Sequence, residues 1–480
     1  MFRRLWLWRL GCCNSNYDGD FDGRREIVAG FEMFLRMAVS DSTPQTAEKI
    51  WAKIYVGLVG LVFGLALLKF GNPVILDNRI EPPKDFWEFA IQSWPVAWGY
   101  WLLGPVALLG LGLARWKVTK PSWMLWLPLA WLMWQLVCAT HTVNPELTQA
   151  TLKHFVACVV CFYLGFFVLS EVRNLTQFWG IVFICFALVV WMGLDQHFGG
   201  LDTLRRFVYE QGHADQLAPE FLKKLGSNRI FSTLVYPNAF AGVILLLFPP
   251  LAVWLWNSTK ELPNVVRGVF VGFFVYTTVA CLYWSGSKSG WLIGLIMTLL
   301  VLWYGKHSTK QKVLIMCVLL LVGLFGFALK YSSYFERGAS SVGARFDYWR
   351  AAIQVSKENP VWGSGPGTFS IPYKRVKKPE SEMARLAHND YLEQLSDSGI
   401  PGFFLYCSSI IGLLVFLYRK SKVSVGSLEF ATRLGLSGWA MQEFVEFGLY
   451  IPAIGWTSFM FLGWLTAGTS NDIDKGSKTF

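Results

Sequence analysis

The stretch KVLIMCVLLLVGLFGFAL at positions 312–329 decides the class of fold, because its only charge is on its first residue. A run of about 17–25 apolar residues is long enough to cross the hydrocarbon core of a bilayer as a helix. Similar runs recur along the 480-residue chain, which is 54% hydrophobic and only 16% charged. This composition excludes an ordinary soluble protein, a disordered chain and a disulfide scaffold.

Twelve such runs predict an all-α polytopic membrane protein with about twelve transmembrane helices. Charged residues interrupt the eleventh run at Arg433, Glu443 and Glu446. The expected spans lie near 54–70, 93–113, 122–139, 153–170, 177–194, 238–256, 266–284, 289–305, 312–329, 402–418, 428–447 and 451–468.

Lysines and arginines in the short loops predict the orientation of these spans. With the N-terminus inside, the short inner loops carry twelve of these residues and the short outer loops three, namely Arg79, Lys84 and Lys288. We therefore expect both termini in the cytoplasm. The net charge of +11 then reflects membrane topology and attraction to anionic lipid headgroups, and it gives no reason to expect nucleic-acid binding.

Two long segments interrupt the regular succession of spans, and both are expected on the outer side. Long charged loops of this kind often carry function. The second loop contains an amphipathic helix pattern at 344–357, a glycine-rich turn at 363–367 and a further helix expected from 388 to 399. The predicted organisation is an N-terminal cytoplasmic tail (1–53), nine spans (54–329) with an outer loop at 195–237, a large outer loop (330–401), three spans (402–468) and a C-terminal cytoplasmic tail (469–480).

His388, in the sequence Ala387-His-Asn-Asp-Tyr391, is a candidate general base at the outer face. Histidine accepts protons near neutral pH, so it could deprotonate a hydroxyl group. The alternative is a helix-capping or interfacial histidine. The other histidines show no metal-ligand spacing, and most cysteines lie inside apolar runs, so we expect neither a metal site nor a cofactor.

Basic residues expected at the same outer face are candidates for binding phosphate. The series Arg337, Arg345 and Arg350 offers guanidinium forks that match phosphate oxygens, although Arg345 and Arg350 lie about 140° apart on a helix. Its alternative is a solvated helix face paired with Asp347 and Glu358. Lys288, in Ser285-Gly-Ser-Lys-Ser-Gly290, is the basic residue of a tight turn whose backbone amides could bind an anion.

These residues together resemble the O-antigen ligase and polymerase superfamily of bacterial inner-membrane glycosyltransferases. The most specific match is His388-Asn389, followed after nine residues by Gly399 and then by Gly402. The segments Gly343-Ala-Arg345-Phe-Asp-Tyr-Trp349 and Pro360-Val-Trp-Gly363-Ser-Gly365 are similar to further family motifs, as is Tyr236-Pro-Asn238. One departure is Lys288, where the family usually has an arginine; lysine keeps the charge but loses the bidentate fork.

The resemblance implies a donor glycan that is attached through pyrophosphate to a polyprenol, and an acceptor hydroxyl on lipid A-core or on another glycan. It implies that His388 takes the acceptor proton and that Arg345 and Lys288 stabilise the pyrophosphate, with Arg337 and Arg350 as further candidates. It also implies an inverting reaction without metal or ATP, in a periplasmic site that is open to membrane lipids.

Other functions stay open on the sequence alone. Within the same superfamily, a glycan polymerase and a protein O-oligosaccharyltransferase share the donor motifs. A transporter or flippase would also suit twelve spans, although such proteins usually contain internal repeats and charged or broken helices at mid-membrane. A structural or sensory membrane scaffold is the other non-enzymatic alternative.

Overall fold

The computed structural model describes residues 44–114, 123–210, 226–336, 340–420 and 423–476. The chain divides into two compact units, Met1–Ala52 and Lys53–Phe480. Most of the predicted N-terminal tail and the candidate residue Arg337 lie outside the described residues. Apart from the first residues of helix α2, all further description concerns the unit Lys53–Phe480.

The described residues form helices and turns and contain no strand. Among the described residues, eight helical segments are long and apolar enough to cross a membrane, and two further apolar helices are slightly shorter. The predicted all-α polytopic fold is therefore confirmed, and every predicted span overlaps a helix. These helices are α2 (Pro44–Lys69), α4 (Val96–Leu113), α5 (Trp123–Ala139), α6 (Pro145–Phe167), α7 (Thr176–Asp195), α10 (Pro237–Ser258), α11 (Asn264–Trp284), α12 (Lys288–Tyr304), α13 (Thr309–Glu336), α16 (Asp390–Cys407) with α17 (Leu413–Lys420), α18 (Leu428–Gln442) and α19 (Pro452–Gly476).

The centre of the unit is built from two closely packed helix pairs, α6 with α19 and α10 with α18. A Cβ atom on Gly165 would lie 2.1 Å from the Met460 carbonyl oxygen, and one on Gly463 would lie 1.9 Å from the Phe162 carbonyl oxygen. Small residues allow such close backbone approach between membrane helices. The packing of α6 against α19 therefore depends on glycine in both helices.

Helix α18 is shorter than the eleventh predicted span. It ends at Gln442, before Glu443 and Glu446, and a 3₁₀ turn at Gly448–Tyr450 leads to α19. The two glutamates thus lie in a turn between helices, whereas the apolar pattern placed them inside a span. This difference brings both carboxylates to the end of the helix bundle.

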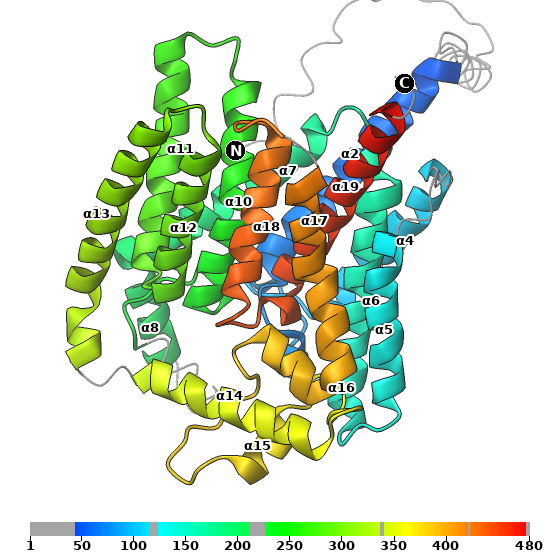
Figure 1. The fold of residues 1–480 in the computed structure, drawn as a ribbon, viewed down its shortest axis with the longest axis vertical. Coiled ribbons are helices and arrows are strands. Elements are labelled where there is room, and N and C mark those ends of the chain that lie inside the picture. The colour runs from blue at the N-terminus through cyan, green and yellow to red at the C-terminus, as the bar shows by residue number, and fades with distance from the viewer. Residues whose placement is uncertain (1–43, 115–122, 211–225, 337–339, 421–422, 477–480) are drawn as a thin grey trace, which may run out of the picture. The chain divides into compact units, whose positions relative to one another are not determined.

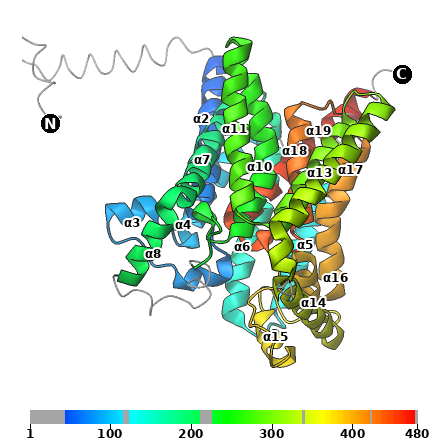
Figure 2. The same ribbon diagram turned by 90° about the vertical axis from the view of Figure 1, so that its left-hand side faces the viewer.

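Four further α-helices of the described residues lie between the membrane helices in sequence, the first of them α3 (Phe86–Ile91). Helix α14 (Ser340–Glu358) matches the amphipathic helix predicted at 344–357 and packs against α15 (Ser370–Val376) and α16. Both views show α14 and α15 across the lower ends of the long helices (Figure 1, Figure 2). Helix α8 (Leu201–Glu210) continues α7 after a break at Phe198 and Gly199.

Candidate active site

His388 lies immediately before α16, at a position fixed by the helix cap. The Asn389 side chain accepts a hydrogen bond from the Leu392 backbone N–H at 3.0 Å, which satisfies one of the free amides of the first turn. His388 itself has a φ of +51°, and its carbonyl oxygen accepts a hydrogen bond from Trp349 Nε1 at 3.4 Å. Asn389 and Trp349 therefore hold the backbone from which the imidazole projects.

The His388 ring lies between aromatic side chains and stays 29% exposed. Its centroid is 5.8 Å from that of Tyr348 in a stacked arrangement and 4.7 Å from that of Phe447 at a steep angle. Nδ1 faces Glu446 Oε2 at 3.5 Å. One edge of the imidazole is thus directed at a carboxylate while part of the ring can still meet solvent or substrate.

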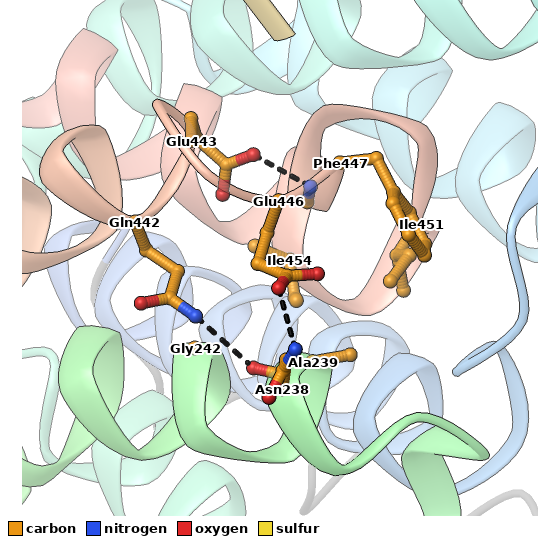
Figure 3. A pocket seen from close by; sticks show the side chains of 10 residues that line it. Asn238, Ala239, Gly242, Gln442, Glu443, Glu446, Phe447, Ile451 and Ile454 are labelled. Carbon is orange, nitrogen blue, oxygen red and sulfur yellow. Dashed lines mark hydrogen bonds between the residues drawn. The ribbon is translucent and has the colours of Figure 1, made fainter. Parts of the chain in front are cut away.

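Glu446 is the residue on which the candidate site converges. Its side chain is only 7% exposed, and Oε1 accepts hydrogen bonds from Asn238 Nδ2 at 2.5 Å and from Arg345 Nη2, which also forms an ion pair with it. Figure 3 shows the contact between Glu446 and Asn238. Four separate segments therefore meet at this carboxylate: α10, α14, the residues before α16 and the turn after α18.

The charges around Glu446 favour its ionised form. The residue lies in the turn after α18, outside the spanning helices. Burial alone would raise the pKa of Glu446, but Arg345, His388 and Asn238 lower it, and the net direction is below its ordinary value. Glu446 is therefore a buried carboxylate with several donors around it.

Arg229 extends the same network on the other side of Asn238. Its Nη2 donates to Asn238 Oδ1 at 2.6 Å and its Nε donates to the Ser285 carbonyl oxygen at 2.8 Å. Burial, ahead of any neighbouring charge, lowers the pKa of Arg229. Gly286 lies over this guanidinium, where a Cβ atom would come within 3.1 Å of Nε.

Lys288 begins α12 beside this arginine. Ser287 caps the helix by accepting a hydrogen bond from the Gly290 N–H at 3.2 Å. Lys288 Nζ lies 3.7 Å from the centre of the Tyr334 ring, and both Arg229 and Arg345 lie close enough to act on it electrostatically. Arg229, Lys288 and Arg345 are thus three cations that lie near one another, and Glu446 contacts Arg345. This cluster of positive charge suits an anionic ligand.

The glycine motifs join the end of α14 to α16. The Ser364 and Gly365 amides donate to the carbonyl oxygens of Ser396 and Asp397 at 3.0 and 2.8 Å, and the Ile400 amide donates to Pro360 O at 2.8 Å. At this joint the close approach leaves no room for a side chain at Gly363 or Gly399, where a Cβ atom would lie 2.4 Å from the Asp397 carbonyl carbon and 2.2 Å from the Val361 carbonyl oxygen. A Cβ atom on Gly365 would instead meet Thr142 Oγ1 at 2.2 Å, and one on Gly402 would meet Ser398 Oγ of the same helix at 2.1 Å.

Gly399 also breaks α16, with a φ of +68° and a ψ of −171°, where the pattern predicted the helix to stop. The close contacts at Gly363 and Gly399 thus join the end of α14, the helix that carries Arg345, to the helix that follows His388.

The predicted residue Arg350 lies apart from this network. Arg350 is 64% exposed and lies 3.6 Å from Asp347, the partner expected for a solvated face. Among the described residues no three His, Cys, Asp or Glu side chains gather as a metal site.

Sequence reasoning did not assign a role to Glu446 or Arg229. An ionisable residue inside an apolar run often indicates a functional site, and Glu446 is such a residue in the eleventh predicted span. For Arg229, the sequence indicates only that the residue lies in a long outer loop, nine residues before Asn238.

A small pocket opens beside Glu446, between α10 and the turn after α18. Its volume is about 220 Å³ with its open mouth included. Figure 3 shows Asn238 and Glu446 on its wall. The lining residues are Asn238, Ala239, Gly242, Gln442, Glu443, Glu446, Phe447, Gly448, Ile451 and Ile454.

Comparisons with known proteins concern the family of the chain. Residues 273–407 match the family model described as O-antigen ligase, which supports the resemblance to the O-antigen ligase superfamily. The matched region contains Lys288, Arg345 and His388 but not Arg229, Asn238 or Glu446. An uncharacterised protein of Haemophilus influenzae is 28% identical over 159 residues, which cover 28% of this chain and 40% of that protein. The chain thus spans less than half of the length of this relative.

Proposed function

We propose that this chain is a membrane glycosyltransferase of the O-antigen ligase type. It would transfer a polyprenyl-pyrophosphate-linked glycan to a hydroxyl group of a lipid A-core sugar, at the periplasmic face of the bacterial inner membrane. One observation carries the proposal: the candidate base His388 and the phosphate-binding candidate Arg345 contact the same buried carboxylate, Glu446. The O-antigen ligase family match supports the reaction class.

The proposed reaction is a single displacement at the anomeric carbon. The acceptor oxygen forms the new glycosidic bond while the bond from the sugar to pyrophosphate breaks, and polyprenyl pyrophosphate leaves with the bonding electrons. His388 takes the proton of the acceptor hydroxyl. Because attack and departure occur on opposite faces, the configuration at the anomeric carbon inverts.

Arg345 and Lys288 would stabilise the negative charge that grows on the leaving pyrophosphate. Arg345 uses Nη2 for Glu446, while its Nε makes no hydrogen bond within the described part of the chain. Arg229 lies close enough to Lys288 to add to the same positive field. Side-chain cations would thus supply the charge stabilisation, and the proposal requires neither metal nor ATP.

The surface glycan of a deletion strain tests the proposal. Loss of a ligase leaves full-length polymer on its lipid carrier and none on lipid A-core. Loss of a polymerase of the same superfamily instead leaves single repeat units on core. An unchanged glycan pattern, with no glycan transfer by the purified protein, would contradict both and favour a transporter or a scaffold.

A further inference from the structure

The two oxygens of the Glu446 carboxylate have different surroundings. Oε1 accepts hydrogen bonds from both Asn238 Nδ2 and Arg345 Nη2. Oε2 faces His388 Nδ1 at 3.5 Å. Nδ1 is buried and forms no hydrogen bond within the described residues, so the Glu446 carboxylate is the polar group that it faces. The carboxylate is thus anchored by one oxygen and presents the other to the imidazole.

We infer that Glu446 is a positioning residue that holds the proton of neutral His388 on Nδ1 and leaves the Nε2 lone pair free. An ionised carboxylate only accepts hydrogen bonds, so the ring nitrogen that faces it must be the donor. A neutral imidazole carries a single N–H, and Nε2 is therefore the acceptor. The assignment of Nε2 as the base in glycan transfer rests on the proposed function; the tautomer itself does not.

The same contact becomes stronger when His388 accepts a proton. The acceptor hydroxyl would give its proton to Nε2, so the ring becomes an imidazolium with an N–H on both nitrogens. The Nδ1–H donor then carries positive charge and faces the Glu446 carboxylate, and charge-assisted hydrogen bonds are shorter and stronger than neutral ones. Glu446 would therefore stabilise the protonated base without contacting the substrate.

The other charged and titratable groups around this pair are compatible with an ionised Glu446. From α14, Arg345 forms an ion pair with Glu446 and Tyr348 stacks on the His388 ring. Arg229 acts on Glu446 electrostatically from the segment before α10. Glu443 is the neighbouring acid in the same turn. Its side chain accepts a hydrogen bond from the Gly448 N–H at 2.6 Å, which holds the Glu443 carboxyl group within the turn.

Glu446→Gln provides a directed test, because the structure predicts how the amide will orient. Two donors point at Oε1, so the amide oxygen of the glutamine takes that place. Its NH₂ group then faces His388 Nδ1 and can only donate. The variant should consequently move the imidazole proton to Nε2, which removes the lone pair needed for proton acceptance.

Nitrogen-15 solid-state NMR of the full-length protein in lipid bilayers reads this tautomer directly. The sequence contains six histidines, so the His388 signals are identified by comparison with His388→Gln. At a pH where the ring is neutral, we expect Nδ1–H in the wild type and Nε2–H in Glu446→Gln. The control variant Glu429→Gln makes the same change in the Arg433–Glu429 ion pair, and its His388 signals should match those of the wild type. A wild-type Nε2–H tautomer, or an unchanged tautomer in Glu446→Gln, overturns the inference.

Transfer kinetics give a second readout, with donor glycolipid and lipid A-core extracted from the deletion strain. Glu446→Gln should lower kcat at least ~100-fold, the usual scale of general-base catalysis, with little change in the donor KM. Wild-type kcat in Glu446→Gln would contradict a positioning role. Absence of transfer by the wild type would instead defeat the proposed function, and the NMR result would still decide the tautomer.

Discussion

At the scale of single residues, His388 owes its position to neighbours that do no chemistry. The Asn389 cap, the Trp349 hydrogen bond and the flanking Tyr348 and Phe447 rings fix the imidazole. The alternative interpretation of a helix-capping histidine does not describe this geometry, because Asn389 provides the cap. A histidine left free of the capping role, with one edge on a carboxylate, is well placed for proton transfer.

His388→Ala should therefore reach the membrane in normal amounts and lose glycan transfer by a factor of ~10² to 10⁴, the range for a removed general base. Immunoblotting of membrane fractions and transfer assays with the purified variant check this expectation. His307→Ala, at an exposed position in the turn between α12 and α13, is the control and should transfer normally. Wild-type transfer by His388→Ala would rule out the assigned base.

Arg345→Lys tests whether a fork is needed at this position. Lysine keeps the positive charge but cannot contact Glu446 and a phosphate oxygen with a rigid planar group. We expect the donor KM to rise roughly tenfold, equivalent to ~1.4 kcal/mol. Arg375→Lys, in the exposed Arg375–Glu358 ion pair, makes the same change outside the site and should have no effect. An unaltered donor KM in Arg345→Lys would argue against a bidentate contact.

At the scale of elements, the joint between the end of α14 and α16 determines where Arg345 lies relative to His388. Gly399 has a backbone conformation that is essentially restricted to glycine, and a Cβ atom there would lie 2.2 Å from the Val361 carbonyl oxygen. Any side chain at this position must push the turn at 360–365 away from α16. The motif glycines thus affect the site through helix placement.

Gly399→Ala should destabilise the protein by at least ~1–3 kcal/mol, the usual cost of such a backbone conformation in a residue with a Cβ atom. Gly343→Ala is a matched control within α14, because a Cβ atom there meets nothing within 4 Å. Removal of a helix glycine should stabilise α14 by about 0.5–1 kcal/mol. Thermal unfolding in detergent compares the two variants, and equal melting temperatures would show that the joint tolerates a side chain.

The sequence predicted the elements better than the turns between them. Apolar run lengths located the membrane helices, and amphipathic spacing located α14 almost to its ends. The same apolar pattern extended the eleventh span through Glu443 and Glu446, since hydropathy cannot show where a helix stops when apolar residues continue beyond it. The partners of Glu446, Asn238 and Arg345, lie 208 and 101 positions away, and no local pattern encodes such pairings.

At the scale of the whole molecule, the asymmetric distribution of Lys and Arg predicts which end of the bundle faces the cytoplasm. Alkaline phosphatase, which is active only in the periplasm, reports the side of a fusion point. A fusion after Glu382 should be active and a fusion after His307 inactive, because the two positions lie in loops assigned to opposite sides. Activity of both fusions, or the reverse pattern, would contradict the proposed periplasmic location of the site.

The wide separation of the site residues also has a consequence for biosynthesis. Membrane proteins are made from the N-terminus, and His388 and Arg345 leave the ribosome before Glu446 does. Until the turn between α18 and α19 is in place, the nascent chain has a histidine and an arginine without their shared carboxylate. Under the proposed function, the site would therefore lack its positioning carboxylate until the final helix pair has been inserted.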